Sequence, residues 1–170
     1  MRYIKEYNQF NNFIISNIQN SEIEEVLDIC VNVFDAVDSP DEIKSYLREE
    51  TDFNISLKAT INNKIVGCYL FNTKSVNDFL KDCDCLKEDI SKYENKRGIQ
   101  GLALALLPEY RGSGIGKELR KMSINKNYDY IWGQHLKGLH NIDQWEKFGR
   151  RVIADGNIDG EEMYVTLMDI

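Results

Sequence analysis

The spacing of hydrophobic residues in the first fifty positions predicts one strand followed by two helices. Phe13 to Ile18 is a short apolar run rich in isoleucine, which is typical of a strand. Ser21 and Glu24 have the spacing of a capping box and predict the start of a helix. Ser39-Pro40 predicts a second helix start, with serine at the N-cap and proline at the first helical position. The apolar stripe of the first helix is Ile23, Val26, Leu27, Cys30, Val31 and Phe34.

The pattern changes to a period of two after residue 54. Apolar residues alternate with polar ones up to Ile61, and a second apolar run follows from Lys64 to Phe71. Asn62-Asn63 lies between the runs and tolerates a positive φ, so residues 54–72 predict a β-hairpin. Residues 74–97 are rich in charge and predict one or two short helices or a partly ordered loop.

The second half of the chain predicts a central strand and several shorter elements. Residues 99–107 form a nearly unbroken apolar run, which is typical of a strand covered on both faces, and Pro108 ends it. We then expect a helix over 113–125, a strand over 128–132, a short helix over 141–148, and strands over 151–154 and 163–168 with turns at Asp155-Gly156 and Asp159-Gly160. Together these elements predict an α/β domain with a largely antiparallel sheet.

Arg111 to Gly116 has the composition of a phosphate-binding turn. It places three glycines in five positions between the central strand and the helix that follows. The start of a helix exposes unpaired N–H groups at the positive end of its dipole, and glycine leaves them open to a phosphate. Arg111 and Lys117 add positive charge beside them. The alternative is that the glycines serve only a tight turn. The Gly-Lys-Ser/Thr ending of a nucleoside-triphosphate loop is absent, and so is the acidic residue of a dinucleotide fold.

The stretch Pro108-Glu109-Tyr110-Arg111-Gly112-Ser113-Gly114-Ile115-Gly116 resembles the acetyl-CoA signature of the GCN5-related N-acetyltransferase (GNAT) superfamily. The signature reads Arg/Gln-x-x-Gly-x-Gly/Ala, and Arg111, Gly114 and Gly116 match it. The order of the predicted elements is similar to that of the family over nearly the whole chain. The resemblance implies a mixed, mostly antiparallel sheet flanked by helices. It also implies one domain over residues 1–170, with 74–97 as a charged insertion between the third and fourth strands.

The resemblance also implies a function and a set of binding residues. The expected activity is transfer of an acetyl group from acetyl-CoA directly to a primary amine. Backbone pairing with the pantetheine arm is implied for the central strand, at Leu104, Ala105 and Leu106, whose side chains would equally serve the core. Contact with the pyrophosphate is implied for Arg111, Gly112, Ser113, Gly114, Ile115 and Gly116, with Lys117 adding charge.

The catalytic residues depart from the family pattern. An alkyl amine is less than about 0.1% neutral at pH 7, so a base or a water chain must remove its proton. The family commonly protonates the departing thiolate from a tyrosine, but Trp145 stands at that position and indole is no acid. His135 is the nearest titratable substitute, although a loop histidine without a role is the alternative. Tyr164 is a further candidate. The departure leaves a second hypothesis, a regulatory acyl-CoA-binding domain that has lost catalysis.

Composition limits the partners and the location that we expect. A net charge of −7 argues against nucleic acid and anionic membranes as partners, and it is compatible with a cationic acceptor. The acceptor itself is left open between a small-molecule amine, a polyamine and a protein amine, and a homodimer is allowed for. With no signal-like or membrane-spanning apolar run, we expect a cytoplasmic protein. We therefore expect free thiols. At Cys83-Asp84-Cys85 a metal site or a redox switch is the alternative, but no second Cys or His pair lies near it in the sequence, so we expect free thiols and no metal there as well.

Overall fold

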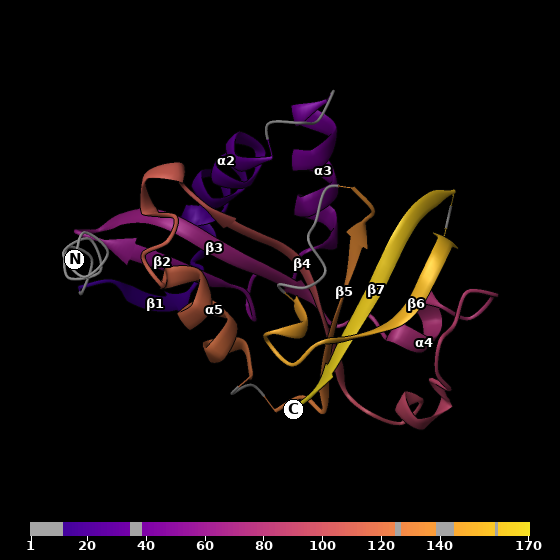
Figure 1. Ribbon diagram of the computed structural model, residues 1–170. Helices are drawn as coiled ribbons and strands as arrows, with labels where there is room; N and C mark the ends of the chain where they lie inside the picture. The colour runs from indigo at the N-terminus through magenta and orange to yellow at the C-terminus, as the bar shows by residue number, and fades with distance from the viewer. Residues whose placement is uncertain (1–11, 35–38, 125–126, 139–144, 159) are drawn as a thin grey trace. The chain divides into compact units, whose positions relative to one another are not determined.

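The structure, a computed structural model, describes residues 12–34, 39–124, 127–138, 145–158 and 160–170. Its strands hydrogen bond in the order β1-β2-β3-β4-β5-β7-β6 to form a seven-stranded mixed sheet with flanking helices (Figure 1). β4 and β5 pair in parallel, whereas β1 with β2, β2 with β3, β5 with β7 and β6 with β7 are antiparallel. The predicted α/β class with a mostly antiparallel sheet is confirmed.

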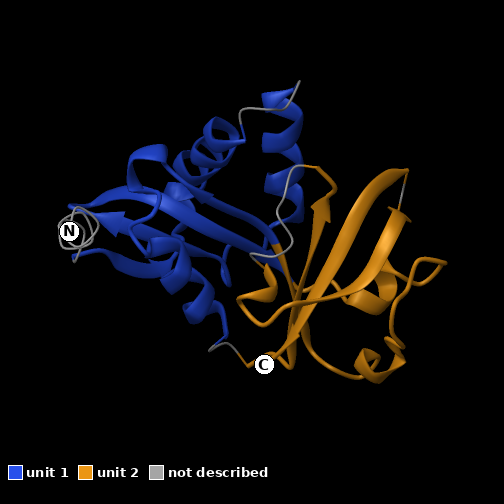
Figure 2. Cartoon of the chain, in the orientation of Figure 1, with its two compact units in different colours: residues 1–72, 102–126 blue, residues 73–101, 127–170 orange. Residues whose placement is uncertain are grey.

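The chain divides into two compact units (Figure 2). Unit 1 consists of residues 1–72 and 102–126, and unit 2 of residues 73–101 and 127–170. β4, Gly98–Leu106, contributes its first four residues to unit 2 and the remainder to unit 1. The expectation of a single domain over residues 1–170 stays a prediction.

Unit 1 consists of strands with helices packed on them. In Figure 1, α2 and α3 lie on one side of its strands and α5 lies on the other. The strands are β1 (Ile14–Asn17), β2 (Leu57–Ile61), β3 (Lys64–Asn72) and the end of β4. The α-helices are α2 (Ile23–Val33), α3 (Pro40–Glu50) and α5 (Ile115–Ile124), and the 3-10 helices are η2 (Asn20–Glu22) and η4 (Pro108–Tyr110).

The core of unit 1 forms where the predicted stripe of α2 meets β3 and β4. Its buried residues include Val26, Leu27, Cys30, Leu47, Ile65, Cys68, Leu70, Ala103 and Ala105. Burying each large aliphatic side chain contributes about 1.5–3 kcal/mol. Cys30 and Cys68 are free thiols, as predicted, and their sulfurs lie 3.4 Å apart. The hydrogen bond between these thiols and their burial raise the pKa of Cys30, which keeps it protonated at neutral pH.

The start of α2 differs from the prediction, whereas the next helix start and the hairpin agree with it. The capping box joins Gln19 and Glu22, and the Gln19 N–H donates to Glu22 Oε2 at 2.7 Å. The predicted box at Ser21 and Glu24 was wrong because η2 precedes α2 and moves the cap upstream. α3 does begin at Ser39-Pro40. The Asn62-Asn63 turn has the expected positive φ values of 50° and 64°.

Unit 2 is built around β5 and the C-terminal hairpin. The parallel ladder joins Gly98–Gln100 of β4 to Tyr130–Trp132 of β5 (Tyr130–Leu136). β7 (Glu161–Asp169) pairs with β5 on one side and with β6 (Arg151–Ile158) on the other. Asp155-Gly156 lies inside β6, so the turn predicted there was wrong. β6 continues through this pair because its backbone bonds to β7 on one side and to residues 85–87 on the other.

The charged segment 74–97 is ordered against the sheet of unit 2. It contains α4 (Val76–Phe79) and the 3-10 helix η3 (Ser91–Tyr93), and it covers a core of Val76, Leu80, Tyr93, Tyr130, Trp132, Ile153, Val165 and Leu167. The buried Tyr93 donates a hydrogen bond of 2.8 Å to Asp169. Arg151 pairs with both Glu88 and Asp169 at 2.9 Å. Burial, with the bond to Asp169, raises the pKa of Tyr93 to about 12.

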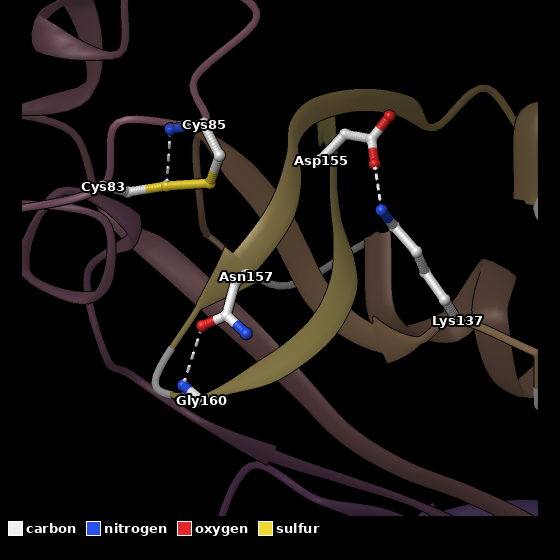
Figure 3. Close-up of a disulfide and its surroundings, with 6 residues drawn as sticks. All are labelled: Cys83, Cys85, Lys137, Asp155, Asn157 and Gly160. Carbon is white, nitrogen blue, oxygen red and sulfur yellow. Dashed lines mark hydrogen bonds and ion pairs between the residues drawn. A yellow bond between two sulfur atoms is a disulfide. The ribbon is translucent and has the colours of Figure 1, made fainter.

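The structure joins Cys83 and Cys85 in a disulfide, which corrects the prediction of free thiols (Figure 3). The prediction rested on the expected compartment, and at Cys83-Asp84-Cys85 it preferred free thiols over a metal site or a redox switch. The local fold separates them: the backbone of Cys83-Asp84-Cys85 turns so that the two sulfurs meet, with the Cα atoms 5.3 Å apart.

Candidate functional site

The glycine-rich turn of unit 1 follows β4 directly. η4 leads out of the strand, and the backbone then passes through Gly112 and Gly114 before α5 begins at Ile115. Both glycines have positive φ, 77° and 89° respectively. A side chain is strained in this region, so the turn geometry itself explains why these two positions are glycine.

Gly116 has no such explanation. It lies in the first turn of α5, where φ is not positive, and beyond the backbone of that helix a Cβ added there would meet no atom within 4 Å. Glycine inside a helix costs about 1 kcal/mol relative to alanine. Neither the backbone nor the packing of the described residues requires glycine here. The missing Cβ leaves the surface beside the helix N-terminus open.

The same helix start presents unused hydrogen-bond donors. Ser113 is buried and donates to the Tyr110 carbonyl at 2.6 Å, while its hydroxyl oxygen accepts the N–H of Ile115 at 3.4 Å. The N–H groups of Gly114, Gly116 and Lys117 make no hydrogen bond within the described part of the chain. Such donors at the positive end of a helix dipole attract an anion.

Two exposed cations flank these donors. The Nε of Arg111 donates to the carbonyl of Leu106 at 3.4 Å, which ties the side chain to the end of β4. Lys117 lies in the first turn of α5, where a positive charge opposes the helix dipole. An anion bound at this turn would relieve that repulsion, so the charges and the donors favour the same ligand chemistry.

The strand before the turn is held by a close approach that the sequence analysis missed. A Cβ on Gly67 of β3 would lie 2.8 Å from the carbonyl oxygen of Ala105 and 3.3 Å from Cα of Leu106. Gly67 therefore lets β3 approach β4 and sets the position of the strand end. Its signal was a lone glycine within an apolar strand, which often marks such an approach. Ala105 is fully buried, while Leu104 and Leu106 are half-buried.

His135 lies in unit 2 and is only 7% exposed, so it is not the loop histidine of the alternative interpretation. Its Nε2 is 2.9 Å from the hydroxyl oxygen of Thr166, on the neighbouring strand β7. Its ring stacks on that of Trp145, with the centroids 4.6 Å apart. Tyr164 is directly opposite His135 in the register of β5 and β7.

Sequence reasoning missed two residues around this histidine, because only the strand register brings them together. Thr166 is buried, and its hydroxyl also contacts the carbonyl of Gly133 at 3.5 Å. Arg150 is buried as well; its Nη1 donates to Thr166 at 3.4 Å and its guanidinium lies 4.9 Å from the ring centre of Trp145. The predicted short helix over 141–148 falls largely outside the described residues, which resume at Trp145.

Comparison with solved structures finds N-acetyltransferases of similar fold. Polyamine N-acetyltransferase from Drosophila melanogaster, which forms N-acetylagmatine, aligns with 94% of this chain and 100% of its own, with a TM-score of 0.71 and 10% identity. A GNAT family acetyltransferase from Elizabethkingia anophelis, solved with acetyl-CoA bound, aligns with 94% of this chain and 99% of its own, with a TM-score of 0.64 and 18% identity. The GNAT fold is established for this chain.

A third GNAT-fold structure is that of an enzyme acting on a protein. Ribosomal-protein-S18-alanine N-acetyltransferase from Escherichia coli covers 94% of each chain with a TM-score of 0.65 and 16% identity. No family model and no curated protein matches the sequence. Sequence identities this low show a common fold but not a common binding site. The ligand and the reaction must therefore be inferred from the residues of this chain.

No group of three or more His, Cys, Asp and Glu side chains in the described ranges is arranged to hold a metal ion. No helix in those ranges has both the length and the apolar character needed to cross a membrane.

Proposed function

We propose that this protein is an acetyl-CoA-dependent N-acetyltransferase that moves an acetyl group directly to a primary amine. The observation that carries the proposal is Gly116, a helical glycine that neither the backbone nor the packing explains. It lies among unused N–H donors and two cations, which is the environment a pyrophosphate requires. The GNAT fold supplies the second line of support.

The cofactor would lie along the end of β4 and the start of α5. Gly114, Gly116 and Lys117 would donate their N–H groups to the pyrophosphate, and Ser113 would hold the turn in shape rather than bind. The parallel ladder between β4 and β5 covers only Gly98–Gln100, so Leu104–Leu106 lie beyond it. Their backbone would pair with the pantetheine arm, with acetyl-CoA as the donor and no metal in the reaction.

The transfer would require a neutral amine and a stabilised leaving group. The amine nitrogen attacks the thioester carbonyl, the C–S bond breaks, and the acceptor becomes an amide while CoA leaves as a thiolate that takes up a proton. His135 is our candidate for a titrating group in this step. Because it is buried, it would exchange a proton through water or through the Thr166 hydroxyl rather than by open contact with the solvent.

The acceptor would be a primary amine of either of two classes. Of the enzymes with similar structures, the Drosophila melanogaster enzyme forms N-acetylagmatine from a small cationic amine, and the Escherichia coli enzyme acts on the alanine of a ribosomal protein. The net charge of −7 favours a cationic acceptor for this chain. The panel that tests the proposal therefore pairs agmatine and spermidine with a peptide that begins in alanine and a peptide that contains lysine.

The decisive assay measures CoA thiol release with acetyl-CoA and each amine, above the rate of thioester hydrolysis. We expect release with at least one amine, together with an equal amount of acetylated product detected by mass spectrometry. The variant Gly116→Leu, which places a branched side chain beside the N–H donors, should lose activity through weaker acetyl-CoA binding. Release without acetylated product on any amine would contradict the proposal.

A second candidate function is that of an acyl-CoA-binding regulatory domain without turnover. Trp145 favours this second function, because it stands where the family commonly has its acidic tyrosine, and its ring packs on that of His135. Calorimetric titration of acetyl-CoA separates the two functions: tight binding with no turnover on either amine class supports the regulatory domain. Formation of an acetylated amine excludes the regulatory domain without turnover.

A further inference from the structure

The Cys83–Cys85 disulfide lines a surface hollow of about 610 Å³ in unit 2. α4 and the residues after it form one wall, and the end of β6 forms the other. The hollow is lined by Asp78, Lys81, Asp82, Asp84 and Asn157 as well as by the two cysteines. Figure 3 shows the disulfide on the segment beside β6, the strand that carries Asp155 and Asn157. The sulfur pair is therefore next to a space that a small molecule can enter.

We propose that this disulfide is a thiol–disulfide exchange site, reduced reversibly by small neutral or cationic thiols that enter the hollow. The proposal is independent of acetyl transfer. Three features support it. The disulfide closes a loop of a single residue, a hydrogen bond makes one of its sulfurs the better leaving group, and the charged residues of the hollow should favour cationic thiols over anionic ones.

The disulfide encloses a single residue, so it is a weak structural crosslink. In the chain-entropy account, the stabilisation from a disulfide grows with the length of the loop that it closes. Other bonds hold this segment on β6. The Asp155 N–H donates to the Cys85 carbonyl at 3.1 Å, the Lys87 N–H donates to the Ile153 carbonyl at 2.8 Å, and Lys87 pairs with Asp155 at 2.7 Å. Reduction can therefore occur without undocking the segment.

The two sulfurs are not equivalent. The N–H of Cys85 donates to Sγ of Cys83 at 3.2 Å (Figure 3). A hydrogen bond to sulfur stabilises the thiolate, and the sulfur with the more stable thiolate is the better leaving group. An incoming thiolate should thus attack Sγ of Cys85, and the S–S bond should break with its electron pair on Cys83. A second thiolate then attacks the mixed disulfide, which leaves two protein thiols and one small-molecule disulfide.

The lining of the hollow sets the preference among thiols. Asp78, Asp82 and Asp84 carry three negative charges against one positive charge on Lys81. All four residues are exposed, so their field is screened by salt. The hollow should repel a thiolate that carries an additional negative group and accept one that carries an ammonium.

The test measures reduction of the oxidised full-length protein by cysteamine, 2-mercaptoethanol and 2-mercaptoethanesulfonate, with each rate divided by the thiolate concentration. At low ionic strength we expect the cationic thiol to react about three- to tenfold faster than the anionic one, and the difference to collapse near 1 M salt. The variant Asp78→Asn/Asp82→Asn/Asp84→Asn should lose the preference. A small soluble disulfide measured in parallel gives the intrinsic order of the three reagents.

Peptide mapping after a brief pulse of cysteamine and alkylation with N-ethylmaleimide tests the direction of attack. We expect the mixed disulfide on Cys85 and the maleimide on Cys83. Cys83→Ser and Cys85→Ser should form no intramolecular bond and so show no reducible disulfide. Failure of the oxidised protein to gain two alkylatable thiols on reduction would overturn the proposal. So would the same order of rates as the free disulfide, or a mixed disulfide on Cys83.

Discussion

Replacing Gly116 with leucine should make the protein more stable and its acetyl-CoA binding weaker. The position is helical and its Cβ meets no atom within 4 Å, so leucine, a strong helix former, should add about 0.5–1 kcal/mol to the free energy of unfolding. For a chain of this length that is about a 2 °C rise in the melting temperature. The branched side chain should cover the N–H donors of the turn, whereas alanine, which the signature allows at this position, should not. Losing one charge-assisted hydrogen bond costs about 1.5–3 kcal/mol, which weakens acetyl-CoA affinity roughly 10- to 150-fold.

Two measurements decide the outcome: thermal unfolding without ligand, and calorimetric titration with acetyl-CoA. Gly160→Leu is the matched control, because Gly160 also has open space around its Cβ but a φ of 89°, and it lies in the other unit. It should destabilise the protein by about 1 kcal/mol and leave affinity unchanged. A more stable Gly116→Leu protein that binds acetyl-CoA as tightly as the wild type would refute the proposed phosphate role of this turn.

Three further results are expected. Gly114→Glu should abolish acetyl-CoA binding in calorimetry, because a carboxylate would occupy the phosphate position; unchanged affinity would exclude the site. His135→Ala should lower kcat about 100-fold and remove one limb of the pH–rate profile, whereas wild-type kinetics would make the histidine structural. Tyr93, with a pKa raised from 10 to about 12, favours the folded state fully below pH 10. About 1–2 kcal/mol of stability, allowing for screening, should disappear between pH 10 and 12. Chemical denaturation should show this loss in the wild type and in Tyr46→Phe, an exposed control, but not in Tyr93→Phe; an equal loss in all three would contradict the assignment.

The glycine-rich turn after β4 was predictable because its backbone requirements are local. Glycines between a strand and a helix expose the N–H donors of that helix wherever the rest of the chain lies. The turn formed as expected, with positive φ at Gly112 and Gly114. The role that we propose for Gly116 depends on its surroundings, since the sequence could not separate a glycine needed by the backbone from one that leaves space.

The surroundings of His135 were not predictable from spacing. Thr166 lies 31 residues away along the chain, and the register of β5 and β7 brings its hydroxyl within 2.9 Å of the ring. The capping box and the Asp155-Gly156 turn failed for a related reason. Local motifs compete with neighbouring elements. The helix η2 moved the capping box upstream, and backbone pairing along both edges of β6 replaced the predicted turn at Asp155-Gly156.

The sequence by itself determined the element order, the α/β class and the turn after β4, because periodicity and backbone preference act over a few residues. Tertiary structure alone decided which groups meet across strands. It buried His135 against Thr166, let Gly67 bring β3 close to Ala105, and joined Cys83 to Cys85 beside β6. Such contacts depend on strand register and on the local path of the backbone, and no pattern within a single segment encodes either of them.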